Sequence, residues 1–492
     1  MNILLIYPQF PDTFWSFTYA LPFIGKKAAF PPLGLITVAA LLPEQWNKRL
    51  VDVNIENLTD EDLAWADLVF IGGMAIQRTS AQQLIARCHA ADRTIVAGGP
   101  LFTIEPHAFR EVDHLVLDEA ELTLPAFLAD LDSGQPKKVY RAGRFCDLGD
   151  TPVPLWNLVK MQKYASMNLQ FSRGCPFNCE FCNVTTLFGH RPRIKTSQQV
   201  IAELDRLYAS GWRSSIFFVD DNFIGNKEYL KNHLLPALLE WRQDKKGCVF
   251  FTEASINLAD DPELLAMMVQ AGFDSVFIGI ESPDEGSLTE CHKTQNKNRD
   301  LLESVKRIHR SGLQVMGGFI VGFDSDSPSI FQRQIDFIQR SGIVIAMVGM
   351  LQAPPGTRLF DRLQRESRVV NTFSGDNVDG TTNILPRMGM EKLARGYQVV
   401  MEQIYSPRNY YRRVRTLLRE LKTPAINQPM SVQRFLSCFR AAFRLGVLGQ
   451  ERFQYWHLII WTLIRRPRLI PVAITLSIYG YHYRKICELY IL

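Results

Sequence analysis

The chain contains the stretch Phe171-Ser-Arg-Gly-Cys175-Pro-Phe-Asn-Cys179-Glu-Phe181-Cys182, in which three cysteines fall within eight residues at C-x3-C-x2-C spacing. A structural zinc site usually has four protein ligands, and His190 is the only nearby candidate for the fourth. A [4Fe-4S] cluster with one iron open to an outside ligand fits three thiolates better. The pattern therefore predicts one metal site. No second cluster is formed by the six other cysteines, Cys88, Cys146, Cys248, Cys291, Cys438 and Cys487.

This stretch resembles the cluster motif of the radical S-adenosylmethionine (SAM) superfamily. The resemblance implies that Cys175, Cys179 and Cys182 hold three irons, while the amino and carboxylate groups of SAM chelate the fourth. It also implies that Phe181 packs near the adenine of SAM. A structural zinc site, or three unrelated thiols, is the alternative interpretation.

Length and composition are those of a globular protein. The 492 residues are 47% hydrophobic and 21% charged, which is enough chain for about two to four domains. An odd number of cysteines with one tight thiolate cluster predicts a reducing compartment. The chain begins with an apolar strand and no basic leader, so we expect a cytoplasmic protein without a signal peptide.

Residues 1–135 show short apolar runs that alternate with helical stretches. This alternation predicts a parallel, doubly wound sheet of the Rossmann-like type, whose ligand crevice lies beyond the carboxyl ends of its strands. The expected strands are Ile3–Tyr7, Leu50–Ile55, Leu68–Gly72, Thr94–Ala97 and Leu115–Leu117, with helices at Leu33–Leu42 and Ser80–Ala91.

Small and acidic residues follow these strands. Their order, directly upstream of the cysteine motif, resembles the cobalamin-binding domain of class B radical SAM enzymes. The motif Asp-x-His-x-x-Gly is absent, because Asn54 stands where its histidine would be, so we expect no histidine ligand from this motif on the cobalt. Alternatively, the glycines only end strands, and residues 74–78 only lead into a helix. The cobalamin contacts that the resemblance implies are Gly72, Gly73, Met74, Gln77, Gly98, Gly99, Pro100, Glu119 and Glu121.

Residues 136–165 lack a sustained period and are predicted to be an interdomain connection. Residues 166–360 then repeat strand and helix signals six times, which predicts a (β/α)6 partial TIM barrel with its chemistry at the carboxyl ends of the strands. The expected strands are Asn168–Phe171, Ser215–Val219, Val249–Thr252, Ser275–Ile280, Val315–Val321 and Ala346–Leu351.

Polar and glycine residues stand where the barrel strands end. A carboxylate suits a ribose diol because it accepts two hydrogen bonds at once. For each of these residues, a capping or ion-pair role is the alternative. The SAM contacts that the resemblance implies, besides Phe181, are Asp220, Glu253, Ser255, Gly279, Glu281, Gly318 and Gly322.

Residues 361–492 are predicted to be a helical, basic extension, similar to that of proteins related to hopanoid C-2 methylases. From Ser406 onward there are fifteen Lys and Arg against three Glu, a net +12, which leaves −7 for the rest of a chain whose total is +5. The apolar runs Tyr455–Ile464 and Leu469–Tyr481 are shorter than the roughly 18 residues that span a bilayer. Flanked by aromatics and arginines, they predict either helices at a membrane surface or a helical cap on the barrel.

The resemblance implies a cobalamin-dependent radical SAM methyltransferase that acts on an unactivated carbon of a hydrophobic small molecule. Catalysis would use a 5′-deoxyadenosyl radical and methylcobalamin, with an electron donor such as flavodoxin or ferredoxin, and no nucleic-acid partner is expected. A non-methylating radical SAM cyclase or anaerobic oxidoreductase is the first alternative. An iron–sulfur redox sensor is the second, and the SAM-type residues on several strands argue against it, because a sensor needs only the cysteines.

Overall fold

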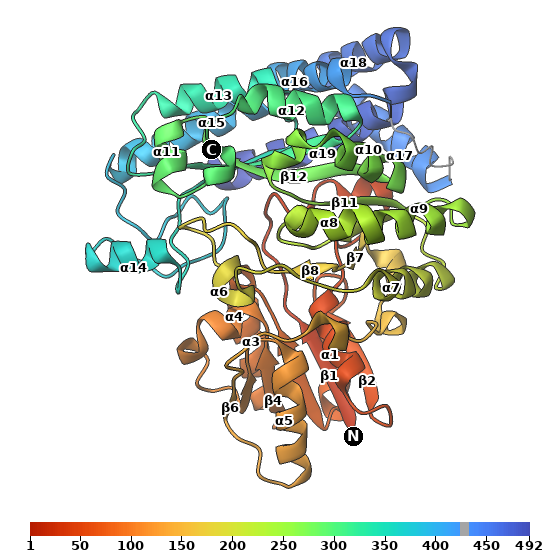
Figure 1. The fold of residues 1–492 in the computed structure, drawn as a ribbon, viewed down its shortest axis with the longest axis vertical. Coiled ribbons are helices and arrows are strands. Elements are labelled where there is room, and N and C mark those ends of the chain that lie inside the picture. The colour runs from red at the N-terminus through yellow and green to blue at the C-terminus, as the bar shows by residue number, and fades with distance from the viewer. Residues whose placement is uncertain (424–431) are drawn as a thin grey trace.

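The structure is a computed structural model that describes residues 1–423 and 432–492, with side chains described up to 423 and from 434. In Figure 1 a sheet formed by the first 140 residues, with its helices, makes up the lower part of the molecule. A second sheet with its helices lies above it, and the C-terminal helices pack against that second unit.

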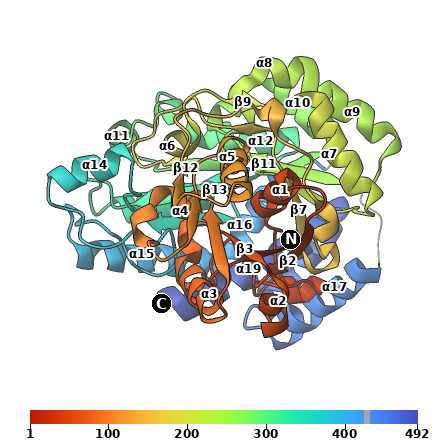
Figure 2. The same cartoon turned by 90° about the horizontal axis from the view of Figure 1, so that it is seen from below.

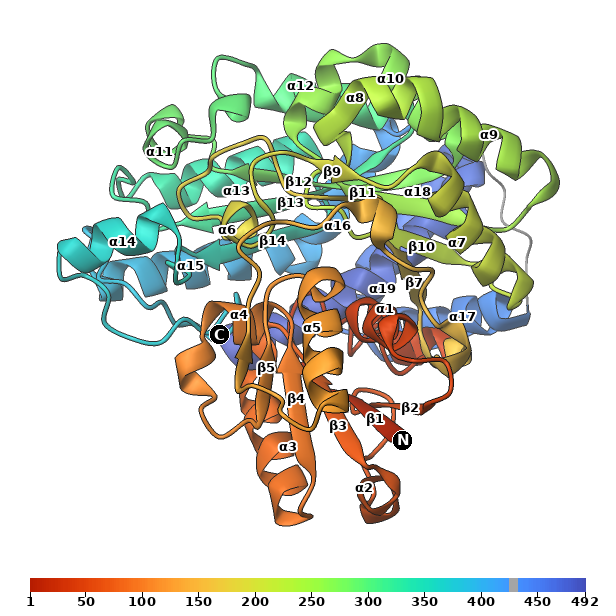
Figure 3. The ribbon, with the colours of Figure 1, turned by 60° about the horizontal axis from the view of Figure 1, so that its bottom comes forward.

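The first sheet is parallel, in the order β2-β1-β3-β4-β5-β6. Helices cover both of its faces, α1 and α5 on one and α2, α3 and α4 on the other (Figure 3). Ile3, Leu4, Leu5 and Ile6 of the interior strand β1 are fully buried, which is why this run is apolar without alternation. The elements are β1 Asn2–Tyr7, α1 Leu33–Leu41, β2 Asn47–Asp52, α2 Asp60–Trp65, β3 Leu68–Gly72, α3 Arg78–Ala90, β4 Thr94–Gly98, α4 Pro100–Ile104, β5 His114–Val116, α5 Ala120–Asp132 and β6 Val139–Tyr140.

The structure adds one strand to those expected from the sequence and shifts another. The strand β6 lies inside the predicted connection 136–165 and pairs with β5. A two-residue edge strand between polar residues gives no sequence period, so it was missed. The strand β2 ends at Asp52, and Asn54 therefore lies in the turn that follows it. The domain limits themselves stay a prediction.

The second sheet is also parallel, in the order β14-β13-β12-β11-β10-β7, and a two-stranded ribbon, β8 and β9, lies beside it. All six predicted barrel strands are present; β7 lies two residues before its predicted position, and the other five differ from the prediction by at most two residues at either end. The predicted α/β fold class is confirmed. The strands are β7 Ser166–Leu169, β8 Ser172–Arg173, β9 Arg193–Ile194, β10 Ser215–Phe218, β11 Val249–Glu253, β12 Phe273–Glu281, β13 Gln314–Val321 and β14 Ala346–Met350. The helices are α6 Val184–Phe188, α7 Ser197–Ala209, α8 Lys227–Tyr229, α9 Leu235–Asp244, α10 Pro262–Ala271, α11 Glu285–Glu290, α12 Leu301–Ser311, α13 Ile330–Ser341 and α14 Arg358–Arg365.

The two faces of this second sheet differ in burial. Residues that point to the helices, such as Ile216 and Ile278, are completely buried. Their neighbours on the inner face, such as Phe217, Phe277 and Gly279, are only half-buried. Because side chains alternate across a strand, this pattern shows that one face packs in the core while the inner face stays partly accessible.

The C-terminal extension has no helix at residues 366–389 and is mostly helical from Met390 onward in its described part; residues 424–431 lie outside the described residues. Helix α19 packs on the segment after β1: Tyr479 contacts Phe17, and the His482 ring lies 3.2 Å from the carbonyl oxygen of Phe14. The cap interpretation therefore holds for Leu469–Tyr481. Among the described residues, no helix is both long and apolar enough to cross a bilayer. The helices are α15 Met390–Tyr405, α16 Pro407–Glu420, α17 Val432–Phe443, α18 Arg452–Arg465 and α19 Ile470–Ile486.

Candidate active site

The cysteine loop leaves β8 at Gly174, which has a φ of 94°. A Cβ at this position would lie 2.9 Å from three backbone carbonyl oxygens, including that of Gly189. The amide of Cys175 donates to the Gly189 carbonyl at 3.3 Å, and the amide of Cys182 donates to the Cys179 carbonyl at 3.2 Å. Only glycine fits this turn, which folds the loop tightly and brings the three thiols into one region.

The thiols of Cys175, Cys179 and Cys182 are all half-buried. Burial raises the pKa of Cys175, and it raises the pKa of Cys182 to about 12; in both cases the charge of neighbouring thiolates adds to the rise. Three such thiolates favour a shared cationic partner, and this donor set fits an iron–sulfur cluster. Among the described residues, no three His, Cys, Asp or Glu side chains are grouped to bind a single metal ion.

Asp220, at the end of β10, holds the chain that enters the cysteine loop. Its carboxylate accepts hydrogen bonds from the Phe171 amide at 3.1 Å, the Ser172 hydroxyl at 2.5 Å and the Ser172 amide. Burial raises its pKa to about 7, although these hydrogen bonds oppose the rise. Since both oxygens already have partners and only 1% of the residue is exposed, the structure gives Asp220 a positioning role, and its contact with SAM stays a prediction.

The carboxylate of Glu253, at the end of β11, is more accessible than that of Asp220. The residue is half-buried, and no hydrogen bond to its carboxylate is present among the described residues. Burial raises its pKa to about 8, and the charges of Asp221 and Asp220 add to the rise. Two residues after the strand ends, the hydroxyl of Ser255 already donates a hydrogen bond to the side-chain oxygen of Asn257 at 2.6 Å. Of these two predicted SAM contacts, Glu253 is therefore the one whose polar atoms are unoccupied.

Glu281 forms an ion pair with Lys293, a residue that the sequence reasoning missed. Glu281 has a left-handed φ of 61° at a break in the β12–β13 register, and it is only 6% exposed. Lys293 Nζ lies 2.5 Å from Glu281 Oε1. A Cβ on Gly279 would overlap both side-chain ends, so this glycine leaves room for the pair. Burial alone would lower the pKa of Lys293, but the charges of Glu281 and Cys179 raise it.

Gly318 and Gly322 lie on the neighbouring strand. Gly318 pairs with Gly279 across the sheet, and a Cβ on it would come within 2.9 Å of the Phe277 ring. Gly322 has a φ of 107°, and its amide donates to Asp326 at 2.8 Å. Phe181 packs in the same small apolar cluster as Phe323, which follows Gly322. Gly318 therefore lies within β13, and Gly322 and Phe323 lie just beyond its carboxyl end, with Phe181 packed beside Phe323.

The crevice of the first sheet lies where the chain order reverses, between β1 and β3. Gln77 is buried there; its amide nitrogen donates to the Pro8 carbonyl at 2.5 Å, and its oxygen accepts from the Met74 amide at 2.9 Å. Asn54 is bound in the same way to the Phe10 amide at 2.8 Å. Met74 is 50% exposed. The hydrogen bonds of Gln77 thus fix the conformation of this loop, and the side chain of Met74 is exposed to solvent. The cobalamin contacts of both residues stay predictions.

Glycines bring two loops of this crevice together. A Cβ on Gly98 would lie 2.5 Å from the Val116 carbonyl, and one on Gly72 would lie 3.0 Å from Leu35. Gly99 has a φ of 91°, and a Cβ on it would meet the Gly73 carbonyl at 3.4 Å. Close packing alone thus explains why positions 72 and 98 are occupied by glycine. The other two glycines and Pro100, the first residue of α4, bring the loops after β3 and β4 side by side.

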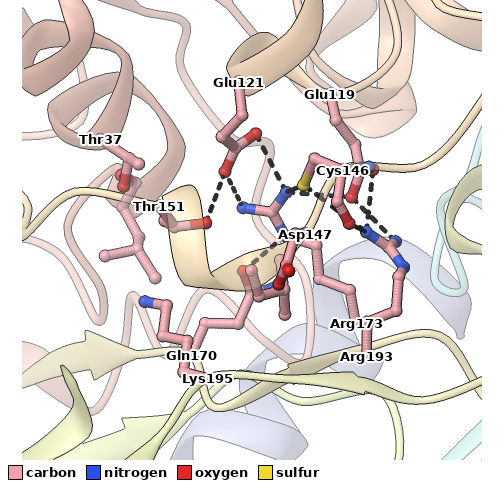
Figure 4. Close-up of polar contacts among 12 residues, drawn as sticks. Thr37, Glu119, Glu121, Cys146, Asp147, Thr151, Gln170, Arg173, Arg193 and Lys195 are labelled. Carbon is pink, nitrogen blue, oxygen red and sulfur yellow. Dashed lines mark hydrogen bonds and ion pairs between the residues drawn. The ribbon is translucent and has the colours of Figure 1, made fainter. Parts of the chain in front are cut away.

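Glu119 and Glu121, beside the start of α5, bind arginines of the cysteine-bearing unit (Figure 4). Arg173 lies 3.0 Å from Glu119 and 2.7 Å from Glu121, and Arg193 lies 2.9 Å from Glu119. Both glutamates are almost completely buried; their burial would raise the pKa, but the arginines hold it below its usual range. Because Arg173 lies two residues before Cys175, the first domain is bonded directly to the cysteine loop. We call this group the interdomain clamp.

Comparison with known proteins shows the family. The model of the Radical SAM superfamily matches residues 169–338. The hopanoid C-2 methylase of Rhodopseudomonas palustris is 36% identical to this chain, over 94% of the chain and 90% of that protein. The chain belongs to the radical SAM superfamily. The prediction made from the cysteine motif is thus confirmed, and this radical SAM protein is an enzyme.

Other similarities extend over the whole radical SAM protein. An uncharacterized methyltransferase of Synechocystis sp. is 40% identical over 99% of the chain and 92% of that protein. Residues 357–491 match a family described as a domain of unknown function (DUF4070). The solved structure of the methyltransferase TsrM from Kitasatospora setae covers 93% of the chain and 99% of its own, with a TM-score of 0.60 and 16% identity. The cobalamin-dependent radical enzyme OxsB covers 100% and 84%, with a TM-score of 0.63 and 14% identity. These two structures share the fold.

Proposed function

We propose that this protein is a cobalamin-dependent radical SAM methyltransferase that methylates a carbon of a hydrophobic small molecule. The observation that carries the proposal is the position of the cysteine loop, which the interdomain clamp ties to the loop after β5, at the carboxyl edge of the first sheet. Two methyltransferases are similar over nearly the whole length. TsrM and OxsB, which share the fold, are described with cobalamin bound.

Three groups of residues would hold the cofactors. Cys175, Cys179 and Cys182 would bind a [4Fe-4S] cluster, and the residues around Glu253 and Gly318 would bind SAM. The loops after β3 and β4 would hold cobalamin, without a histidine from the second strand. When bound, the cluster supplies the electron that cleaves SAM to a 5′-deoxyadenosyl radical, and cobalamin carries the methyl group. An electron donor such as flavodoxin or ferredoxin stays a prediction.

The chain's own residues prepare the site in two ways. Lys293, paired with Glu281, places a buried positive charge near Cys179. Glu253 offers a carboxylate that has no hydrogen-bond partner among the residues that the structure describes, and it suits a ribose diol. With Phe181 and the glycines of β12 and β13, these groups would orient SAM above the cysteine loop.

The inner face of the barrel supports an apolar substrate. Phe217 and Phe251 stack with their ring centres 4.7 Å apart, and Phe30 lies 5.4 Å from Phe217. Trp15 lies 5.2 Å from Phe277. All five side chains are only half-buried. Trp15 and Phe30 come from the segment between β1 and α1, so both domains contribute to one aromatic surface, which favours a flat or lipid-like molecule.

The first alternative function is a radical SAM cyclase or oxidoreductase with the same fold that transfers no methyl group. An anaerobic magnesium-protoporphyrin IX monomethyl ester cyclase of Synechocystis sp. is 22% identical over 69% of the chain. A tracer experiment separates the two functions. Anaerobically reconstituted protein, incubated with methyl-labelled SAM, a reductant and a lipid extract, is expected to yield 5′-deoxyadenosine together with a labelled lipid-soluble product. Formation of 5′-deoxyadenosine with an unlabelled product would favour the cyclase or oxidoreductase.

We predict that cobalamin binds without a protein histidine. Asn54 occupies the position of the missing histidine, and its amide is already bound to Pro8 and Asp52. The cobalt(II) form should therefore give an electron paramagnetic resonance spectrum without hyperfine splitting from a histidine nitrogen. Protein from cells grown with ¹⁵N-histidine provides the control, because a histidine ligand would change its splitting on labelling. Such a change would contradict the prediction.

A further inference from the structure

The outer surfaces of α17, the turn Arg444–Leu448 and α18 are apolar and exposed to solvent. The exposed fraction reaches 67% for Phe439 and 72% for both Phe453 and Ile464. In each helix these residues recur every three or four positions, so they form rows along one side. We call these rows the outer apolar face. Its residues are Phe435, Leu436, Phe439, Phe443, Val447, Leu448, Phe453, Trp456, Ile460, Leu463 and Ile464.

Neither helix needs these side chains for its own packing. Helix α17 already buries Ala441 on its opposite side, and α18 buries Leu458 and Thr462. A surface helix normally has a polar outer side, whereas these helices are apolar on both sides. Exposed rows of large apolar side chains on neighbouring elements mark an interaction site.

The outer apolar face is anchored to the rest of the molecule. The Trp456 indole nitrogen donates to the Gly446 carbonyl at 2.9 Å, which joins α18 to the preceding turn. Arg444 donates to the Tyr481 hydroxyl at 2.8 Å, and Arg440 donates to the Phe23 carbonyl at 3.0 Å. Figure 2 shows α17 at the edge of the molecule and α19 further inside. These hydrogen bonds hold the outer apolar face in a fixed position on the molecule.

The charge of this region indicates which kind of partner binds the outer apolar face. Residues 432–469 contain seven arginines and one acidic residue, Glu451. Glu451 is completely buried and paired with Arg484 at 2.5 Å, so it adds no negative charge to the surface. A second copy in a twofold dimer would bring arginines against arginines. A nucleic acid would pair with the arginines but not with the phenylalanine and isoleucine rows. An anionic lipid bilayer satisfies both the charge and the apolar rows.

We propose that the outer apolar face docks on an anionic membrane, with its phenylalanine and isoleucine side chains at the boundary between headgroups and acyl chains. Arg452, Arg465 and Arg468 would lie at the lipid phosphates. The proposal rests on the proposed function in one respect, namely that the membrane supplies the apolar substrate. Helix α17 packs on the turn Leu21–Ile24, and this turn belongs to the same segment that carries Trp15 and Phe30 to the barrel.

Vesicle co-sedimentation of the full chain tests the docking without any turnover. The vesicles are phosphatidylcholine, with or without phosphatidylglycerol. A triple variant Phe439→Ser, Phe453→Ser and Ile464→Ser should lose at least about 100-fold in partitioning, because three large side chains no longer leave water. The triple variant Arg452→Gln, Arg465→Gln and Arg468→Gln should lose about 100-fold on anionic vesicles only, since each basic residue near such a surface contributes about fivefold.

The control carries Val370→Ser, Leu385→Ser and Val399→Ser, three exposed apolar residues on other elements, with exposed fractions of 45%, 46% and 39%. It should bind vesicles like the wild type. Equal vesicle binding by the wild type and the apolar triple variant would overturn the proposal. So would a wild-type dimer that fails to bind vesicles and that the apolar substitutions convert to a monomer. Intact vesicle binding without any methyl transfer would instead contradict the proposed function alone.

Discussion

The variant Cys179→Ala is expected to lose the iron–sulfur cluster and, with it, all cleavage of SAM. Two thiolates cannot hold three irons, and the loop around Gly174 is too tightly packed to bring in another ligand. Iron content should fall from about four per chain to below about one. Formation of 5′-deoxyadenosine should fall to the level without enzyme. Iron analysis, the visible absorption of the cluster and chromatography of the nucleoside measure the three effects.

The matched control is Cys438→Ala. Cys438 is also half-buried but lies on α17, away from the loop. Its replacement should leave iron content and SAM cleavage at the wild-type level. A Cys179→Ala protein with the full iron content and normal cleavage would refute the assignment of the three cysteines.

Local patterns made the cysteine motif and the barrel predictable from sequence. Cys175, Cys179 and Cys182 are near neighbours along the chain, and most barrel strands contain a run of apolar residues. The ion pair between Glu281 and Lys293 was not predictable from a local pattern. Lys293 follows a helix twelve residues later, and only the left-handed turn at Glu281 brings the two charges together. A single lysine in a polar stretch carries no sequence signal of this pairing.

The ion pairs of Glu119 and Glu121, at the start of α5, show a second limit of prediction from sequence. Glu119 and Glu121 follow a strand, so the sequence placed them at the crevice of the first sheet. Their charges are in fact bound by Arg173 and Arg193, more than fifty residues along the chain. Long-range ion pairs depend on how domains pack, and neither residue type nor spacing encodes that. The apolar run of α19 was ambiguous for the same reason, because burial and membrane contact favour the same residues.

Removing one charge from the interdomain clamp is expected to lower the stability of the protein strongly, because its ion pairs are buried. The variant Arg173→Met would leave Glu119 and Glu121 almost completely buried, with only 3% and 4% of their side chains exposed. Glu119 keeps Arg193 as a partner, whereas Glu121 has Arg173 as its only basic partner among the described residues. Breaking a buried ion pair from one side costs about 3–5 kcal/mol, because the remaining charge, here that of Glu121, loses its partner. Thermal unfolding should therefore begin at a markedly lower temperature than in the wild type.

The control for this variant is Arg310→Met. Arg310 also pairs with two glutamates, Glu303 and Glu420, but its side chain is 49% exposed, and such a surface pair contributes about 1 kcal/mol or less. Replacing the glutamates as well, in Arg173→Met with Glu119→Gln and Glu121→Gln, should recover most of the lost stability. Equal unfolding temperatures for Arg173→Met and Arg310→Met would show that the clamp does not hold the two domains together.

The pH dependence of stability separates the contribution of the ion pairs in the interdomain clamp from that of packing. The arginines hold the pKa of Glu119 and Glu121 below the usual range, although burial opposes them. A carboxylate with a lowered folded pKa contributes stability that is fully present above its unfolded pKa of about 4.3 and is lost as the pH falls through the folded pKa. The stability gap between wild type and Arg173→Met should therefore be constant near neutral pH and should narrow in acid. A gap that stays constant in acid would mean that lost packing of the arginine stem, and not the ion pairs, destabilises the variant.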